Sequence, residues 1–433
     1  MEQVFTYPLK QHVGAPSEPI VQTGNTVLRG QMIARIPADA LSANLFSSVS
    51  GTVREVSDSW IQVTADERQT DDYVKLTSKE PPELIRESGI VGLGGAGFPT
   101  YAKLKTPFQD GKGVVIVNAA ECEPILSHNI DSIEKDAARL VRGLHIIMDV
   151  VHASRGIIAI KDIHDTAIQR LQAAIDNPRI TIGHLPNMYP MGEERAIVRE
   201  TLDILLGVDQ LPMAADAIVV NAETVCRVRD AVDLRKPMID KDMTVAGKLR
   251  DGMIKIFHDV PLGLPVSAVF EKAGGIGPEY GEIIMGGPFT GKRTTLESPI
   301  LKTTGGLIAA EVFWPGPEKL GLLVCACGGN RERLEQIAAS MGSTVVDVQY
   351  CKQAQTMNNG VLKCENPGHC SGQVQKVMAL KKAGAQALLI SNCTDCTNTV
   401  MSCAPQLKLP VFHCTDGALR AVNHKLIRRI KAD

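Results

Sequence analysis

Aromatic residues are scarce in this chain of 433 residues, at 4% of the total with only 2 Trp. So low a content argues against an aromatic-rich β-sandwich. An excess of either charge is also missing, because 46 Lys and Arg stand against 48 Asp and Glu, for a net charge of -2. A chain without a basic field is poorly suited to bind nucleic-acid phosphates or anionic lipid, so we expect no nucleic-acid partner.

Long hydrophobic runs are absent as well. No stretch approaches the roughly 20 apolar residues of a membrane span, and the opening MEQVFTYPLKQH lacks the charged start and apolar run of a secretion signal. We therefore expect no integral membrane segment and a cytoplasmic location. In that setting the 11 cysteines are poorly explained as secreted disulfides, and redox or metal chemistry is the natural interpretation.

The patterns that are present indicate an α/β multidomain protein. Residues 1–80 carry short alternating runs and resemble the barrel-sandwich half-folds of lipoyl and biotinyl carriers, which predicts a barrel-sandwich-like β module. Strands alternate with amphipathic helices over 84–235, which predicts a Rossmann-like parallel core with its ligand loops at the carboxyl edge of the sheet. Segment 243–313 is short and rich in glycine, with a mixture of predicted strands and a short helix. Residues 318–433 predict a four-stranded parallel α/β domain rich in cysteine.

The core begins with a glycine-rich loop, GLGGAGFPTYAKLK at 92–105. Glycines let the backbone approach a phosphate closely, and the N–H groups of a helix start, together with Lys103, would complete an anion site. The letters GLGGAG at 92–97 fit GxGxxG, but no predicted strand leads into them as in the dinucleotide signature, and the loop does not fit GxxxxGK[ST], the NTPase signature. A tight structural turn therefore remains an alternative for this loop taken by itself.

Three further motifs follow in order: NAAECEP at 118–124, YPMGEERAIV at 189–198 and VVNAETV at 219–225. With all four motifs, the chain resembles the NADH-oxidising, FMN-binding subunit of respiratory complex I. It resembles more closely the C subunit of Rnf-type electron-transport complexes, over about residues 1–313. This resemblance implies an FMN and NADH core, followed by a β-grasp segment of the soluble-ligand-binding kind at 243–313.

The resemblance also implies which residues hold the flavin and the nicotinamide. The glycine loop would cradle the FMN phosphate, and the acidic and amide groups of the other motifs would line the pocket. A solvated helix face remains the alternative for Glu193 and Glu194. The implied cofactor-binding residues are Gly92, Gly94, Gly95, Gly97, Lys103, Asn118, Glu121, Gly192, Glu193, Glu194, Asn221, Glu223 and Thr224.

The chain departs from this family at its electron exit. No CxxCxxCxxxCP run, the ferredoxin signature of the Rnf subunit, is found in the sequence. Cys393 and Cys396 instead form a CxxC pair between a predicted strand and a predicted helix, where the helix dipole lowers thiolate pKa and a reversible disulfide can form. We predict these two as the catalytic pair. An iron–sulfur cluster or zinc remains open, with Cys325, Cys327, Cys351, Cys364 and Cys370 as candidate ligands.

The cysteine motifs CENPGHC and NCTDC resemble the small electron-transfer subunit of methyl viologen-reducing hydrogenases, a family with a [2Fe-2S] cluster. Combined with the Rnf-like core, they are most similar to the proline-reductase-associated electron-transfer proteins of amino-acid-fermenting anaerobes. This implies an NADH-oxidising flavoprotein that passes electrons through FMN to the cysteine centre and on to a reductase such as D-proline reductase. The alternatives are a peripheral Rnf-type subunit that exchanges electrons with ferredoxin, and a non-catalytic, zinc-clamped adaptor.

Overall fold

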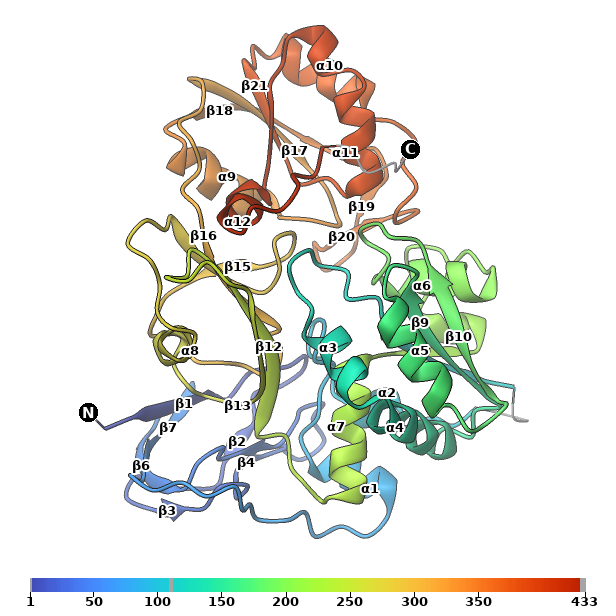
Figure 1. The fold of residues 1–433 in the computed structure, drawn as a ribbon, viewed down its shortest axis with the longest axis vertical. Helices are drawn as coiled ribbons and strands as arrows, with labels where there is room; N and C mark the ends of the chain where they lie inside the picture. Colours follow the sequence, from blue (N-terminus) through green and yellow to red (C-terminus); the bar gives the residue numbers. More distant parts are fainter. Residues whose placement is uncertain (1, 109–111, 429–433) are drawn as a thin grey trace.

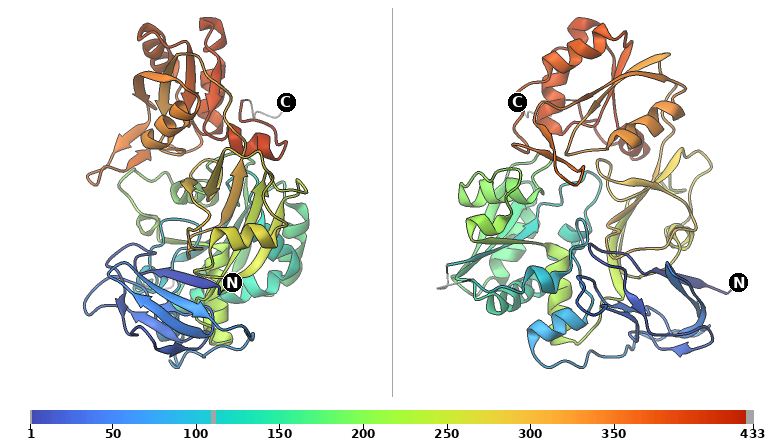
Figure 2. Two further views of the ribbon diagram at one scale, coloured as in Figure 1. Left: turned by 90° about the vertical axis from the view of Figure 1, so that its left-hand side faces the viewer. Right: turned by 180° about the vertical axis from the view of Figure 1, so that it is seen from behind.

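The computed structural model describes residues 2–108 and 112–428. The N-terminal β module lies at one end of the molecule and the cysteine-rich tail, residues 318–428, lies at the other (Figure 1). Between them the parallel core and a mixed sheet lie side by side, as the view from behind in Figure 2 also shows. Within the described ranges, no helix combines the length and apolar character that crossing a membrane requires.

The N-terminal module consists of two antiparallel sheets that share one core. Alternation along its strands buries Val53, Ile61 and Val63 almost completely, whereas the residues between them face outward. The four-stranded sheet has the order β1-β7-β6-β3 and the three-stranded sheet the order β2-β4-β5. The strands are β1 (Val4–Pro8), β2 (Glu18–Pro19), β3 (Thr26–Val27), β4 (Met32–Arg35), β5 (Leu45–Phe46), β6 (Gly51–Val56) and β7 (Trp60–Ala65).

The core is a parallel sheet of order β10-β9-β8-β11 with helices packed against it. Strands β8, β9 and β11 are apolar runs that are mostly buried, as the sequence predicts for a covered parallel sheet, whereas the edge strand β10 is partly exposed. The elements are α1 (Pro81–Glu87), α2 (Thr100–Lys103), β8 (Val114–Ala119), α3 (His128–Lys135), α4 (Ala137–Val150), β9 (Arg155–Lys161), α5 (Asp165–Ala174), β10 (Ile180–Leu185), α6 (Glu194–Leu202), η1 (Pro212–Ala215), β11 (Ala217–Asn221) and α7 (Ala222–Asp233).

Apolar residues recur every three or four positions from Ile130 to Met148, and the structure divides them between two helices, α3 and α4. The chain breaks at Asp136, whose backbone leaves the helical region with φ -149° and ψ 74°. The Asp136 side chain accepts a hydrogen bond from Arg139 N at 3.1 Å and so caps the start of α4. The periodic pattern survives this break because the helices keep the same buried side.

The mixed sheet has the order β13-β12-β16-β14-β15, in which β12 and β16 are parallel and the other neighbours are antiparallel. A single helix, α8 (Val266–Lys272), joins its two hairpins, and β12 is buried along its whole length. The strands are β12 (Asp240–Gly247), β13 (Lys255–Pro261), β14 (Glu282–Met285), β15 (Lys292–Thr294) and β16 (Gly306–Ala310). This sheet supplies the wall that faces the core.

The tail is a four-stranded parallel sheet of order β18-β17-β21-β22, as its strand and helix rhythm predicts. A short hairpin of β19 and β20 was not predicted, and in Figure 1 it projects toward α6 of the core. The elements are β17 (Lys319–Val324), α9 (Arg331–Ser340), β18 (Thr344–Tyr350), β19 (Ala354–Thr356), β20 (Leu362–Cys364), α10 (Val374–Lys382), β21 (Ala387–Ile390), α11 (Thr394–Met401), η2 (Pro405–Leu407), β22 (Val411–His413) and α12 (Asp416–Ala421).

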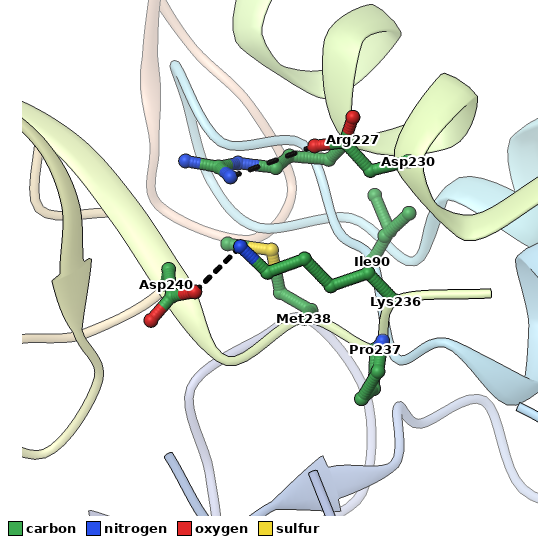
Figure 3. Close-up of a pocket in the computed structure, with 7 residues that line it drawn as sticks. All are labelled: Ile90, Arg227, Asp230, Lys236, Pro237, Met238 and Asp240. Carbon is green, nitrogen blue, oxygen red and sulfur yellow. Dashed lines mark ion pairs between the residues drawn. The ribbon is translucent and has the colours of Figure 1, made fainter. Parts of the chain in front are cut away.

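A small charged cavity lies between α7, the start of β12 and residues 236–238, which join them. Its volume is about 10 Å³, room for about one water molecule. Lys236 Nζ pairs with Asp240 Oδ2 at 2.7 Å, and Arg227 Nη1 lies 3.6 Å from Asp230 Oδ2 (Figure 3). Arg29 of the N-terminal module also pairs with Asp240, at 2.7 Å. The Arg29–Asp240 pair holds the N-terminal module against β12, and all three ion pairs belong to the scaffold.

Candidate functional site

A cavity of about 960 Å³ opens between the core, the mixed sheet, the N-terminal module and the tail. This volume is at the upper end of the range for small-molecule and cofactor sites. Eight of the thirteen predicted cofactor-binding residues line it: Gly94, Gly95, Asn118, Glu121, Gly192, Glu193, Asn221 and Glu223. Cys327 and Cys364 of the tail line it as well, so the predicted flavin site and the cysteine-rich tail share one cavity.

The glycine loop forms the floor of this cavity. A Cβ atom on Gly94 would lie 2.5 Å from Asn221 Nδ2 and would displace that amide, while a Cβ on Gly95 would meet no atom within 4 Å. Gly97 has φ +72° and packs against the backbone of Gln11, which makes it a structural turn. Gly94 and Gly95 therefore leave the open backbone cradle that a flavin phosphate requires, and the residues present fit FMN.

Amide side chains at the carboxyl ends of β8 and β11 join the motifs to one another. Asn118 Nδ2 donates to Gly192 O at 2.9 Å, and Asn221 Oδ1 accepts from Thr224 N at 3.2 Å at the start of α7. Thr224 Oγ1 in turn accepts from Leu93 N of the glycine loop at 3.0 Å. Thr224 thus supports the glycine loop from behind and does not line the cavity.

The carboxylates of the acidic motifs are held by backbone N–H groups. Glu121 accepts from Asn129 N at 2.7 Å and from Ile130 N at 3.0 Å, at the start of α3. Glu223 is buried, accepts from Asp242 N at 2.8 Å and pairs with Lys241. The edges of these carboxylates that face the cavity are therefore fixed in position before any ligand binds.

The GEE motif is divided between two roles. Glu193 lies in the cavity wall and caps α6, where its carboxylate accepts from Arg195 N at 2.8 Å and Ala196 N at 3.0 Å. Glu194 lies outside that wall and pairs with Lys103, with Lys103 Nζ 2.6 Å from Glu194 Oε1. Both side chains of this pair are partly exposed, at 30% and 43%. Two residues expected at the flavin thus neutralise each other beside the loop.

Tyr189 was missed from the sequence. Its ring lines the cavity and stacks on Phe289 of the mixed sheet, with centroids 3.7 Å apart and planes at 3°. Its hydroxyl donates to Cys327 O, and its backbone N donates to Thr394 Oγ1 at 3.0 Å. The sequence offered one signal for Tyr189: it is an aromatic residue next to the GEE motif in a chain that has few aromatic residues. Tyr189 connects core, mixed sheet and tail at one point.

Part of the cavity wall comes from segments that carry no motif. Lys10, Gln11 and His12 of the N-terminal module line it, as do residues 303–305 that precede β16. Burial and the nearby charge of Lys302 lower the pKa of His12 to about 4. No local pattern in the sequence marks these residues, because only packing of the modules brings them to the cavity.

The structure brings all seven predicted tail cysteines together. Cys325 contacts the thiols of Cys327, Cys351, Cys393 and Cys396, and these contacts extend to the two remaining cysteines, Cys364 beside Cys327 and Cys370 beside Cys396. They converge because most follow strands of one parallel sheet, whose carboxyl ends meet at one edge. Cys414 also follows a strand but packs in the apolar core below, where burial raises its pKa to about 12.

The cluster of seven thiols has an inner end and an outer end. Cys327 and Cys364 lie at the cavity, whereas Cys393 and Cys396 are each only 2% exposed. At the outer end, hydrogen bonding to the Cys396 thiol lowers the pKa of Cys370 to about 6, although its partial burial opposes this. Cys351 and Cys396 face each other with their sulfurs 3.9 Å apart.

These thiols contact one another instead of surrounding a common point. Over residues 2–108 and 112–428, no three His, Cys, Asp or Glu side chains form a group that could hold a metal ion. Cys351 and Cys396 lie with their sulfurs 3.9 Å apart, compared with about 2.0 Å in a disulfide bond. All seven cysteines are free thiols, the form from which either a disulfide or a metal–thiolate bond is made.

Helix α6 binds the tail hairpin that carries Cys364. Arg195 Nη2 donates to Cys364 O at 2.7 Å. Arg199 Nη1 donates to Asn366 Oδ1 at 2.7 Å and to Pro367 O at 2.9 Å. The helix that starts at the GEE motif therefore holds the inner end of the cluster against the cavity.

Two family descriptions match the chain. The RnfC barrel sandwich hybrid domain matches residues 1–70, and the Nuo51 FMN-binding domain matches residues 85–230. These matches confirm the broad outline expected from the sequence, a barrel-sandwich module followed by an FMN-binding core.

Curated relatives extend the similarity along the chain. The C subunit of the proton-translocating ferredoxin:NAD(+) oxidoreductase complex of Clostridium ljungdahlii is 32% identical over 330 residues, which cover 71% of this chain and 70% of that protein. The corresponding C subunit of the Na(+)-translocating complex of Acetobacterium woodii is 30% identical over 325 residues, covering 71% and 73%. Cobalamin reductase PduS of Salmonella typhimurium is 35% identical over 237 residues, covering 54% of this chain and 51% of that protein.

Proposed function

Because this chain belongs to the family of RnfC-type C subunits of ferredoxin:NAD(+) oxidoreductase complexes, we propose that it is an electron-transfer oxidoreductase. In this proposal it oxidises NADH at an FMN bound in the large cavity and delivers the electrons to the cluster of seven thiols. From there the electrons pass to a separate reductase, and D-proline reductase is the acceptor that the sequence resemblance suggests.

The observation that carries this proposal is the shared cavity. Gly94 and Gly95 at its floor and Cys327 and Cys364 at its far wall face the same space, although more than 200 residues of sequence separate them. A flavin held by the glycine loop would lie in the same cavity as the inner end of the cluster. A zinc-clamped adaptor without redox activity would have no need for this connection.

FMN, when bound, would supply the conversion between the two-electron chemistry of NADH and the electrons accepted by a sulfur centre. The chain's own residues would do the rest. The N–H groups of Gly94 and Gly95 would bind the phosphate, and Asn118 and Asn221 would orient the ribityl and ring edges through their amides. Tyr189 and Phe289 would exclude water between the cavity and the cysteines.

A second candidate function is that of a peripheral C subunit that exchanges electrons with ferredoxin within a larger complex. The names and the 32% and 30% identities of the two C-subunit relatives favour it. The absence of a CxxCxxCxxxCP run from these 433 residues argues for an exit through the tail instead. Reduction of purified ferredoxin and of D-proline reductase by the same NADH-treated protein separates the two candidates.

The test is an anaerobic absorbance spectrum of the purified protein reconstituted with FMN, recorded before and after NADH, together with iron and zinc analysis. We expect flavin bands that NADH bleaches. Cys393→Ser and Cys396→Ser should each slow electron transfer to the acceptor at least tenfold, while NADH still bleaches the flavin bands. Cys403→Ser, in the same tail but in the apolar core beneath the sheet, is the matched control.

A protein that binds no FMN and contains only zinc would contradict the proposal and favour the adaptor. Survival of acceptor reduction in both cysteine variants would place the exit elsewhere. Iron in proportion to protein, with loss of its visible bands in the two variants, would assign the tail to an iron–sulfur centre and not to a dithiol.

A further inference from the structure

One face of the tail carries lysines that no acidic side chain neutralises. Residues 366–415 contain four lysines and a single acidic residue, Asp395, whereas the whole chain balances 46 Lys and Arg against 48 Asp and Glu. The Asp395 carboxylate already accepts a hydrogen bond from Cys370 N at 2.7 Å. Over the part of the chain that the structure describes, no acidic side chain pairs with the members of this lysine face, which are Lys352, Lys376, Lys381, Lys382 and Lys408.

Helices α10 and α11 form the body of the lysine face. They lie beside each other and pack on the same side of the tail sheet through one apolar core, which includes Val377 and Leu380 (Figure 1). On the outer side of α10, Val374 and Met378 are 47% and 45% exposed, and the exposed Lys382 follows one turn later along the same line. A small apolar centre therefore lies within the lysine face.

The lysine face adjoins the outer end of the cluster of seven thiols. Cys370 is partly exposed, precedes α10 by four residues and contacts the Cys396 thiol. Its Sγ lies 3.4 Å from Thr399 Oγ1 of α11. Lys352 N donates to Gln373 Oε1 at 3.3 Å, which places this lysine at the start of α10. A protein seated on α10 and α11 would therefore lie beside a thiol that connects directly to Cys396.

We propose that the lysine face binds the protein that accepts the electrons, and that this acceptor is a redox protein with an acidic face of its own. Unpaired lysines steer an oppositely charged partner to the surface, and the exposed apolar pair gives the two proteins a contact from which water is excluded. Electron-transfer encounters use small interfaces, so a contact on two short helices is sufficient. The acceptor's place here rests on the proposed function, in which the tail cysteines carry the electrons out.

The experiment measures binding of ferredoxin, an acidic redox protein, to the full-length protein loaded with FMN, by anaerobic calorimetric titration. We expect its Kd to rise about tenfold between about 0.1 M and 1 M NaCl, because the Debye length falls from about 10 Å to about 3 Å. Cytochrome c, a basic redox protein, should show no such binding. Bound ferredoxin should slow hydrogen exchange in residues 374–382 and 394–401, and slow alkylation of Cys370 by iodoacetamide.

The double variant Lys381→Glu, Lys382→Glu reverses two charges of the lysine face. At low salt we expect its Kd for ferredoxin to rise about tenfold, since attraction becomes repulsion at two positions. FMN binding and flavin reduction by NADH should not change, because neither lysine lines the cavity. Lys75→Glu, Lys79→Glu is the matched control, with the same change of net charge at two exposed lysines between β7 and α1.

Three results would each overturn the docking face and leave the proposed electron exit in place: no binding of ferredoxin at low salt, equal loss of affinity in the two double variants, or protection of α10 and α11 by phosphatidylglycerol vesicles and not by ferredoxin. A different result would count against the exit alone. If ferredoxin binds the lysine face but acceptor reduction survives in both Cys393→Ser and Cys396→Ser, the face binds an acidic protein and the proposed exit is wrong.

Discussion

Lys302 is a residue whose charge is governed by burial. It is 0% exposed, and its Nζ donates to Asn44 O at 2.8 Å and to Gly89 O at 2.7 Å, linking the N-terminal module to the core. Burial lowers its pKa from 10.5 to about 7. Between these values the unfolded chain binds more protons than the folded chain, so this residue makes stability rise with pH across that window.

Lys302→Met should remove this rise. Between pH 7 and about 10, the free energy of unfolding of wild type should therefore rise by several kcal/mol relative to that of Lys302→Met, since one pKa unit corresponds to about 1.4 kcal/mol. Urea denaturation at pH 7, 8, 9 and 10 measures it. Lys79→Met, at an exposed lysine, is the control. Parallel curves for wild type and Lys302→Met would show that Lys302 does not titrate in this range.

At the scale of the element, helix α6 positions the tail. Arg199 holds the loop after Cys364 through Asn366 and Pro367, so Arg199→Met removes two charge-assisted hydrogen bonds. We expect unchanged flavin reduction by NADH and a several-fold slower transfer from flavin to the tail, since hydrogen bonds to charged groups contribute about 1.5–3 kcal/mol each. Stopped-flow absorbance separates the two phases.

Arg170→Met, an exposed arginine on the neighbouring helix α5, should leave both phases unchanged. Hydrogen exchange of residues 362–370 should accelerate in Arg199→Met alone. If hydrogen exchange accelerates but the rate of electron transfer from flavin to the tail is unaltered, the position of this loop does not limit that transfer.

At the scale of the whole molecule, the cavity is built by four parts of the chain. A ligand that binds only the folded protein stabilises it by about 2.7 kcal/mol at a concentration 100 times its Kd. Because residues 10–12, 93–96, 303–305 and 362–364 all reach the cavity wall, FMN should slow hydrogen exchange in all four segments. Exchange mass spectrometry with and without FMN measures this. Protection confined to residues 93–96 would indicate a site on the glycine loop alone.

Much of the fold follows from patterns that are short in sequence. The apolar runs of β8, β9 and β11 and the strand–helix rhythm of the tail predict parallel sheets, because burial on both faces selects continuous apolar strands. Asp136 shows the limit of periodicity. The apolar spacing continues through it, but its side chain caps a new helix, a local hydrogen bond that a hydrophobic pattern does not record.

The candidate site was predictable where a residue stands in a motif at a strand end. Asn118, Asn221 and the glycine loop meet because parallel strands bring their carboxyl ends to one edge. The pairing of Lys103 with Glu194 was not predictable, since it depends on how α2 and α6 pack, and 91 residues separate the two side chains. Lys10 and Tyr189 were missed for the same reason.

By itself, the sequence determined the modules, the parallel sheets, the resemblance to the RnfC family and the identity of the cysteines that could carry redox chemistry. These features rest on periodicity, turn chemistry and local motifs, which act over a few residues. Only the tertiary structure decided that the cavity reaches Cys327 and Cys364 and that seven thiols form one cluster while Cys414 stays apart. Such meetings depend on the packing of distant segments, and no local pattern encodes their distances.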